Sequence, residues 1–553
     1  MRLPLVLSGS LSLLLCASAT PIVSLPYGTF QGFNTGNLTA FLGVPFAQAG
    51  RFEVPRAPGI LHGVQNATNF GPSCPQQKFS AAVAKIPALG NGAVLPNTPV
   101  VIGEDCLTLD VYKPATANAK SKLPVLVWVY GGGFDVGNSR ATNLNPVVER
   151  SISTGFPVLV VAINYRVTAF GFLAGKEVAA AGVTNLGTRD QIFALQWVQK
   201  NIAAFGGDPT RVVLGGVSAG AISTAFLLLD NKHASNKLFH GAFMEAGSPA
   251  TAPSVADGQA DFDGLVTANN CSHVHDTLDC LRQVPLASLM ATINNTPDLF
   301  SFKTLDLVWR PRVDGDVVVQ DPLISVQKGL YSKMPFMTGD SDDEGSIFTP
   351  ALTNLTTDAD FLNYVHSNFL PAATKDQIAQ VGRLYPADPA QGSPFGTGTA
   401  DQLTPQSKRL AAFLGDLTFI GPRRSFLEHA SSRQNTWSWL NKQFKNTSEF
   451  GSFHTSDEVI WFLTGPNPDF TALDALVNFI NTLDPNKHAG RSSSSHSAAS
   501  NSKIFWPKWN EASWMGRTSL LTFSDPNVVN VTAENFRVEA MAFLNLLLFA
   551  EAK

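Results

Sequence analysis

The apolar positions of this chain fall into short continuous runs that alternate with segments of helical spacing. The runs 123–130 and 156–164 are apolar almost throughout and rich in β-branched residues, as is typical of strands buried on both faces of a parallel sheet. The segment 190–205 instead spaces its apolar residues, such as Leu195 and Val198, along one helical face. This alternation predicts an α/β fold: a large, mostly parallel, twisted sheet flanked by helices.

The same alternation continues toward the C-terminus. Further strands are expected at 241–245, 335–339 and 436–441. The last apolar run, 540–550, is interrupted by Asn545 and followed by charged residues. We expect a packing helix there; a lipid-anchor signal is the alternative.

One strand-to-helix boundary carries a motif with chemical meaning. The apolar run 212–217 leads into Ser218, and Gly216 and Gly220 flank this serine in the order Gly-x-Ser-x-Gly. Only small residues can flank a side chain held on so sharp a turn, which lifts the hydroxyl above a helix N-terminus, where negative charge is stabilised. The motif therefore predicts a nucleophilic serine on the elbow of an α/β-hydrolase.

A nucleophilic serine needs a base and an orienting acid, which in this fold follow in the order acid, then histidine. His454 lies in the loop after the expected strand 436–441, where a base can reach over the sheet edge. Asp342, Asp343 and Glu344 follow the strand 335–339, and position alone leaves all three open as the acid. A solvated acidic turn is the competing interpretation of that segment.

Acyl transfer also needs donors for a developing oxyanion. Three glycines, 131–133, end the strand 123–130, so that their backbone can approach a substrate closely. Gly132 and Gly133, together with the N–H of Ala219, are candidates for this oxyanion hole. A phosphate-binding loop is the alternative, but the next glycine comes only at Gly137 and no helix start is signalled.

The N-terminus resembles a secretory signal. Arg2 precedes the apolar run 3–15, and Ala17-Ser18-Ala19 matches a cleavage site. Thirteen residues are too few for a membrane anchor, which needs about 20. We therefore expect a signal peptide at 1–19, and a secreted mature chain, 20–553, that forms a single domain.

Composition narrows the possible partners. The net charge is −4 and no basic run occurs, which argues against nucleic-acid binding. The 38 phenylalanines against 7 tyrosines favour a large core and an apolar pocket. Cysteine spacings fit no metal pattern, so no metal is expected.

Cysteines and sequons agree with an extracellular location. Cys16 leaves with the signal peptide, and four cysteines remain, which allow three pairings; proximity favours Cys74 with Cys106 and Cys271 with Cys280. Glycosylation sequons occur at Asn37, Asn66, Asn270, Asn294, Asn354, Asn446 and Asn530.

Several longer motifs occur in a characteristic order. They are 41–47 (FLGVPFA), 104–107 (EDCL), 131–134 (GGGF), 164–167 (NYRV), 170–173 (FGFL), 196–198 (QWV) and 201–209 (NIAAFGGDP). Together with the elbow they resemble the type-B carboxylesterase/lipase family of α/β-hydrolases, over nearly the whole mature chain. The segments 164–174 and 453–454 are most similar to secreted fungal lipases of this family.

This resemblance implies specific roles. It selects Glu344 as the acid and His454 as the base, with oxyanion donors at Gly132, Gly133 and Ala219. It implies the two proximal disulfides and inserted loops and helices over the active site. It also implies two structural ion pairs, Arg51 with Glu104 and Arg166 with Asp190.

The chain departs from the family near the expected site. Val217 stands where the family usually has glutamate, and Glu245-Ala246 where it usually has Gln-Ser. A buried carboxylate and a hydroxyl are therefore missing or moved. The loop between Cys74 and Cys106 is rich in apolar residues and corresponds either to a lid that opens at a lipid surface or to a fixed wall.

The sequence thus predicts a secreted, glycosylated serine hydrolase of hydrophobic carboxylic esters, with triacylglycerols among the candidate substrates. No cofactor and no stable protein partner are implied, and contact with lipid surfaces would be transient. Two alternatives stay open: an esterase dedicated to one specialised metabolite, and an inactive binding member of the fold.

Overall fold

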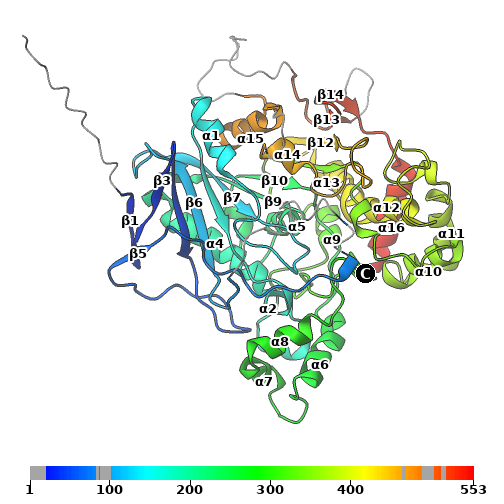
Figure 1. Ribbon diagram of the computed structural model, residues 1–553, viewed down its shortest axis with the longest axis horizontal. Coiled ribbons are helices and arrows are strands. Elements are labelled where there is room, and N and C mark those ends of the chain that lie inside the picture. The colour runs from blue at the N-terminus through cyan, green and yellow to red at the C-terminus, as the bar shows by residue number, and fades with distance from the viewer. Residues whose placement is uncertain are drawn as a thin grey trace, which may run out of the picture.

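A mixed sheet of eleven strands runs through the described part of the chain. The computed structural model describes residues 20–82, 86, 101–463, 469–487, 504–511 and 518–552. Along the sheet the strand order is β14-β13-β12-β11-β10-β9-β7-β8-β6-β4-β3 (Figure 1). The strands are β3 (Phe33–Thr35), β4 (Leu38–Pro45), β6 (Thr108–Pro114), β7 (Leu123–Val129), β8 (Leu159–Ile163), β9 (Gly207–Val217), β10 (Gly241–Glu245), β11 (Phe336–Ser341), β12 (Thr436–Lys442), β13 (Ser519–Ser524) and β14 (Val528–Ala533).

The centre of this sheet is parallel and its two margins are antiparallel. The strands from β8 to β13 pair in parallel, whereas β14, β6, β4 and β3 pair antiparallel. The parallel strands include all the runs expected from the sequence, so the predicted α/β fold is confirmed. The hairpin β13–β14 and the strands at the other margin were not predicted. A smaller sheet of β1 (Ile22–Leu25), β2 (Gly28–Gln31) and β5 (Val64–Asn66) lies beside them.

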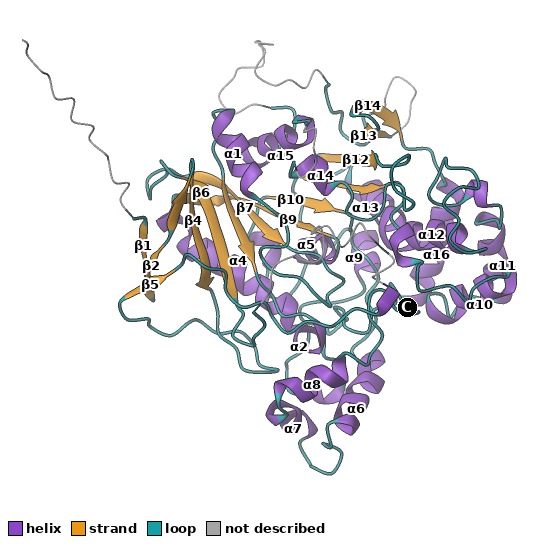
Figure 2. Ribbon diagram, viewed as in Figure 1, coloured by secondary structure: helices purple, strands orange, loops and turns teal. Residues whose placement is uncertain are grey.

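Helices cover both faces of the sheet (Figure 2). One face packs against α1 (Asn145–Ser153) and α15 (Thr471–Thr482), and the other against α4 (Leu186–Phe205) and α5 (Ala219–Leu228). The helix α4 extends the segment predicted at 190–205 by one turn toward the N-terminus. These helices remove both sides of the parallel strands from water, which is why those strands carry no polar face.

Most of the remaining helices form two groups outside the sheet, whereas α14 (Glu458–Trp461) packs against α15. One group projects at the bottom of Figure 1, and the other gathers at its right-hand end around a separate apolar core. The helices are α2 (Thr168–Phe172), α3 (Lys176–Ala180), α6 (Gln259–Ala268), α7 (Thr277–Gln283), α8 (Leu286–Ile293), α9 (Pro322–Lys328), α10 (Asp358–Asn368), α11 (Lys375–Leu384), α12 (Ser407–Gly415), α13 (Gly421–Ala430), α14 (Glu458–Trp461) and α16 (Val538–Glu551).

The helix α16 corresponds to the last apolar run of the sequence. It buries Met541, Leu544 and Leu547 in the right-hand core, as expected of a packing helix. None of the described helices is long and apolar enough to cross a membrane.

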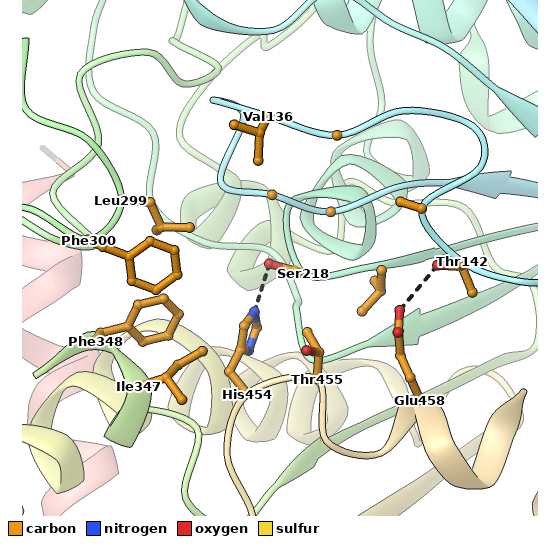
Figure 3. A pocket seen from close by; sticks show the side chains of 15 residues that line it. Val136, Thr142, Ser218, Leu299, Phe300, Ile347, Phe348, His454, Thr455 and Glu458 are labelled. Atoms are coloured by element: carbon orange, nitrogen blue, oxygen red, sulfur yellow. Dashed lines mark hydrogen bonds between the residues drawn. The ribbon is translucent and has the colours of Figure 1, made fainter. Parts of the chain in front are cut away.

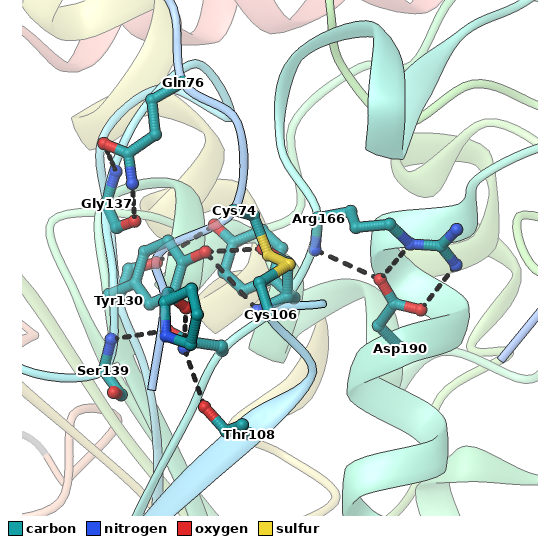
Figure 4. The surroundings of a disulfide bond; sticks show 12 residues. Cys74, Gln76, Cys106, Thr108, Tyr130, Gly137, Ser139, Arg166 and Asp190 are labelled. Carbon is teal, nitrogen blue, oxygen red and sulfur yellow. Dashed lines mark hydrogen bonds and ion pairs between the residues drawn. A yellow bond between two sulfur atoms is a disulfide. The ribbon is translucent and has the colours of Figure 1, made fainter. Parts of the chain in front are cut away.

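Two disulfides and two ion pairs brace the loops beside the sheet, and Figure 4 shows the disulfide of Cys74 with Cys106 and the ion pair of Arg166 with Asp190. The disulfides join Cys74 to Cys106 and Cys271 to Cys280, which confirms both predicted pairs. The ion pair of Arg51 with Glu104 spans 2.7 Å between Nη2 and Oε2.

The second ion pair is fully buried. Arg166 donates from Nε and Nη2 to the Asp190 carboxylate at 2.8 and 2.7 Å, and its backbone N–H donates to the same group at 3.1 Å. Its Nη1 donates to the carbonyl of Glu53 at 2.8 Å. Both predicted ion pairs are thus confirmed.

Some expectations concern residues that the structure does not describe. The signal peptide, 1–19, lies outside the described residues, as does most of the loop between Cys74 and Cys106. Of the seven predicted glycosylation sites, six asparagines are exposed and Asn294 is half-buried.

Candidate active site

Ser218 sits on a sharp turn between β9 and α5. Its backbone has φ 55° and ψ −123°, in a region that side chains rarely adopt. A Cβ on Gly216 would lie 2.5 Å from the backbone carbon of Gly220, and a Cβ on Gly220 would lie 2.0 Å from the carbonyl oxygen of Val129. Only glycine fits at both positions, which explains the Gly-x-Ser-x-Gly pattern.

Three sequence candidates meet at the C-terminal edge of the sheet. Ser218 follows β9, Glu344 follows β11 and His454 follows β12. The Ser218 hydroxyl lies 2.8 Å from Nε2 of His454, and Nδ1 of His454 contacts Oε2 of Glu344 (Figure 3 shows the first of these bonds). This chain of contacts is the arrangement in which a serine can lose its proton to an imidazole.

Of the three acids left open by position, the structure separates one from the other two. Asp342 and Asp343 both form ion pairs with Lys445. The distance from Lys445 Nζ to Asp342 Oδ2 is 2.9 Å. Glu344 instead receives the backbone N–H of Ser341 at 2.6 Å and contacts His454.

The surroundings of Glu344 act on its charge in opposite directions. Burial raises the pKa of Glu344, and the neighbouring charge of Asp340 adds to that rise. The Ser341 N–H and the Arg423 guanidinium oppose it. These two groups favour a carboxylate able to accept the His454 proton on Nδ1.

His454 is enclosed by aromatic rings. Its ring lies 4.4 Å from that of Phe419, in the π-helical turn Asp416–Ile420, and 5.3 Å from that of Phe348. This burial lowers the pKa of His454 to about 4, against the opposing charges of Asp457 and Asp340. The imidazole is therefore uncharged at neutral pH and has an electron lone pair on Nε2 that can accept a proton.

The glycine loop lies directly against the serine. Gly132 and Gly133 have φ values of 106° and 64°, and a Cβ on Gly131 would lie 2.9 Å from that of Ser218. Among the described residues, none accepts a hydrogen bond from the backbone N–H of Gly132, Gly133 or Ala219. These three N–H groups thus lack a backbone acceptor in the described part of the chain, and Gly132 lines the pocket at Ser218, as expected of an oxyanion-hole donor.

A pocket opens above Ser218 (Figure 3) and holds about 540 Å³, open solvent at its mouth included. The described lining has an apolar side (Leu299, Phe300, Ile347 and Phe348) and a side with polar groups (Thr142, Thr455 and Glu458), and it also includes the apolar residues Val136, Ala141 and Val217. The described residues contain no group of three or more His, Cys, Asp or Glu side chains placed to hold a metal ion.

Two buried acids lie behind this pocket. The carbonyl of Glu245 accepts the Ser218 N–H at 2.8 Å, but neither oxygen of its carboxylate has a donor among the described residues. Asp457 lies beside it and accepts a hydrogen bond from Trp439 Nε1 at 2.9 Å. Burial raises the pKa of Glu245 well above its ordinary value and that of Asp457 to about 7. The two groups are therefore suited to share a proton.

Glu245 is recognisable in the sequence as a departure from the family, but no role is predicted there for Asp457, Glu458 or Thr142. The signal was present, because Asp457 and Glu458 follow His454 by three and four residues. At that spacing a turn or short helix after the histidine returns both side chains to its side.

Three comparisons with known proteins bear on this site. A family model described as the carboxylesterase family matches residues 19–513. Secreted lipase 1 of Botryotinia fuckeliana is 39% identical over 85% of each chain, and Lipase 5 of Diutina rugosa is 37% identical over 92% of this chain and 93% of its own. The crystal structure of Aspergillus niger EstA superposes with a TM-score of 0.78 at 26% identity, covering 96% of this chain and 98% of EstA.

Proposed function

The chain belongs to the carboxylesterase family and is a carboxylic ester hydrolase, and from this premise we propose that it acts on hydrophobic esters through Ser218, His454 and Glu344. The observation that carries the proposal is the hydrogen-bonded chain of these three side chains, which opens into a pocket with an apolar side, near three N–H groups that have no backbone acceptor among the described residues. Triacylglycerols are among the substrates proposed, since lipases are among its relatives.

In the proposed first half-reaction, Ser218 Oγ attacks the ester carbonyl carbon while His454 Nε2 takes the hydroxyl proton. The N–H groups of Gly132, Gly133 and Ala219 hold the oxyanion that develops. His454 then returns its proton to the alcohol oxygen, the bond between carbonyl carbon and alcohol oxygen breaks, and an acyl-enzyme on Ser218 remains.

In the second half-reaction, water enters the place of the alcohol. His454 takes a proton from this water as its oxygen attacks the acyl carbon. The proton then passes to Ser218 Oγ as the acyl bond breaks, which releases the carboxylic acid and restores the enzyme. Glu344 holds the imidazole with its proton on Nδ1 and stabilises the imidazolium that forms in each half.

Secretion and glycosylation belong to the same proposal. The segment 1–19 would be removed as a signal peptide, and the mature chain 20–553 would act as a single domain outside the cell. Secreted lipase 1, a relative, is named as secreted, and six of the seven candidate asparagines are exposed. Contact with lipid surfaces would be transient.

Hydrolysis of p-nitrophenyl esters from acetate to palmitate tests the proposal. Ser218→Ala should lower kcat by about 10⁶-fold and abolish labelling by a fluorophosphonate. Ser223→Ala, a buried serine on the same helix α5, is the matched control and should keep both. Undiminished turnover by Ser218→Ala would refute the assignment, and absence of labelling in the parent protein would favour an inactive binding role.

A further inference from the structure

The two sides of the pocket above Ser218 differ in chemistry. On the left of Figure 3 lie the side chains of Phe300 and Phe348, and on the right lie those of Thr142, Thr455 and Glu458. The serine and the histidine stand between them. An ester has two ends, so the contrast bears on which end lies against which side.

The left side suits a hydrocarbon. The rings of Phe300 and Phe348 stack at 5.8 Å, and Phe79 packs edge-on against Phe300 at 4.9 Å. Leu299 and Ile347 complete this surface. It offers no polar group of its own side chains, so an apolar acyl chain gains most by lying here.

The right side presents hydrogen-bonding groups. Glu458, at the start of α14, accepts a hydrogen bond from the Thr142 hydroxyl at 3.1 Å. The Thr455 hydroxyl is buried and has no partner among the described residues. A hydrocarbon placed here would leave the Thr455 hydroxyl without a partner, which costs about 1–3 kcal/mol, and would make no hydrogen bond to the pair of Thr142 and Glu458.

Glu458 is the one carboxyl group among the described residues that line the pocket. Burial, together with the nearby charge of Asp457, raises the pKa of Glu458 to about 8, while Thr142 opposes the rise. At neutral pH the group is a neutral acid, which can donate one hydrogen bond and accept others. Its complement is a neutral hydroxyl group rather than a cation or an anion.

We propose that the right side, formed by Thr142, Thr455 and Glu458, binds free hydroxyl groups on the alcohol part of the ester. The preferred substrates are then esters of an apolar acid with a polyol, such as monoacylglycerols. This inference rests on the proposed function, because it takes Ser218 as the nucleophile and so fixes the two ends of the ester on either side of it.

Two esters that differ only in hydroxyl groups test the inference. Propyl octanoate and 2,3-dihydroxypropyl octanoate share the acyl chain and the length of the alcohol. Both are assayed as monomers, below their critical micelle concentrations. The parent protein should show a kcat/KM ratio of about tenfold or more in favour of the dihydroxy ester, as one or two net hydrogen bonds supply.

Variants of Glu458 and Thr142 test whether these side chains cause the kcat/KM preference for the dihydroxy ester. Glu458→Leu should bring the ratio to about one, whereas Glu458→Gln, which keeps a donor and an acceptor, should hold it within about threefold of the parent value. Thr142→Val, which removes one hydroxyl without changing shape, should give an intermediate ratio. Glu149→Leu makes the same change at an exposed position of α1 and should keep the parent ratio.

The outcomes separate this inference from the proposed function. If p-nitrophenyl octanoate is hydrolysed in a Ser218-dependent way but the parent ratio is about one, the hydroxyl subsite is wrong and the proposed function stands. A parent ratio that Glu458→Leu and Thr142→Val both leave unchanged overturns the subsite as well. If no ester is turned over and no fluorophosphonate is bound, both proposals fail together. Should Glu458→Leu fail to fold, Thr142→Val alone decides the question.

Discussion

The polar groups near the Cys74–Cys106 disulfide and those around the pocket are equally buried, but they differ in how completely they are paired. Arg166 and Asp190 satisfy one another through three hydrogen bonds (Figure 4). Behind the pocket, by contrast, both carboxylate oxygens of Glu245 and one oxygen of Asp457 have no donor among the described residues.

This difference separates buried polar groups that stabilise the fold from buried polar groups that can take part in chemistry. A buried charge that is fully paired holds two segments together and has nothing left to offer a ligand. A buried acid without donors keeps its proton, since burial disfavours its charged form, and it stays available for hydrogen bonding. Substitutions in the first region should therefore change stability, and substitutions in the second should change catalysis or the way in which activity and stability depend on pH.

Among the variants that compare the two regions, the largest effect is expected at the contact between the acid and the histidine. Glu344→Gln keeps the shape but replaces a carboxylate with an amide, so His454 is no longer held with its proton on Nδ1. We expect kcat to fall by about 10⁴-fold with little change in melting temperature. Steady-state kinetics and thermal unfolding measure the two quantities.

The neighbouring acid provides the control for Glu344. Asp342 is equally buried but pairs with Lys445 rather than with the histidine. Asp342→Asn should thus lower stability while kcat stays within about threefold of the parent. A Glu344→Gln protein that retains a tenth or more of the parent kcat would contradict the assigned role.

The next effect concerns the paired region. Asp190→Asn leaves the Arg166 guanidinium buried without its counter-ion, which should lower the free energy of unfolding by about 3–5 kcal/mol. Urea unfolding measures this loss, and kcat on a short ester should remain near the parent value. The double variant Arg166→Met/Asp190→Leu should recover much of the stability; equal losses in the single and double variants would show that the charge is not the cause.

A smaller effect is expected in the pH profile. Because burial lowers the pKa of His454 to about 4, the base stays neutral well below the usual midpoint of histidine. The acid limb of kcat/KM should accordingly have its midpoint below pH 6.5, in contrast to an exposed imidazole. A midpoint at or above 6.5, measured with an ester that does not ionise, would show that burial does not govern this histidine.

Some features of the fold and the site could be predicted from the sequence alone, and others could not. The parallel strands and the glycine elbow were predictable, because continuous apolar runs and small residues around Ser218 reflect local requirements. Position alone could not choose among Asp342, Asp343 and Glu344, since the choice depends on Lys445, about a hundred residues later. Most of the margin strands are short or mix polar with apolar residues, so their patterns are weak.

The polar side of the pocket could not be predicted from the sequence, for a related reason. Glu458 binds Thr142, which lies 316 positions earlier, and only the folded sheet brings the two together. Likewise Glu245 was visible as a departure from the family, but its carboxyl partner Asp457 belongs to another strand-to-helix connection. Long-range contacts of this kind leave no local periodicity to detect.

The smallest effect expected is a gain in stability from Glu245→Gln that depends on pH. Burial raises the folded pKa of Asp457 to about 7 and raises that of Glu245 well above its ordinary value, so the folded state binds protons that the unfolded chain releases above about pH 4. The stability from these protonated acids is full at low pH and declines as pH rises through the folded pKa values. Glutamine does not ionise, and its amide can donate to the Asp457 carboxylate. The variant should therefore match the parent near pH 4 and exceed it by roughly 1–3 kcal/mol at pH 8.

A buried acid that is paired with arginines provides the control for Glu245. Glu534 is just as buried, but Arg423 and Arg424 hold its pKa below the ordinary value. Its contribution to stability is present above the unfolded pKa and is lost as pH falls through the folded one. Glu534→Gln should consequently destabilise the protein at pH 8, whereas Glu245→Gln stabilises it there. Losses of the same sign in both variants, followed by urea unfolding at pH 5 and pH 8, would mean that pairing does not distinguish these two acids.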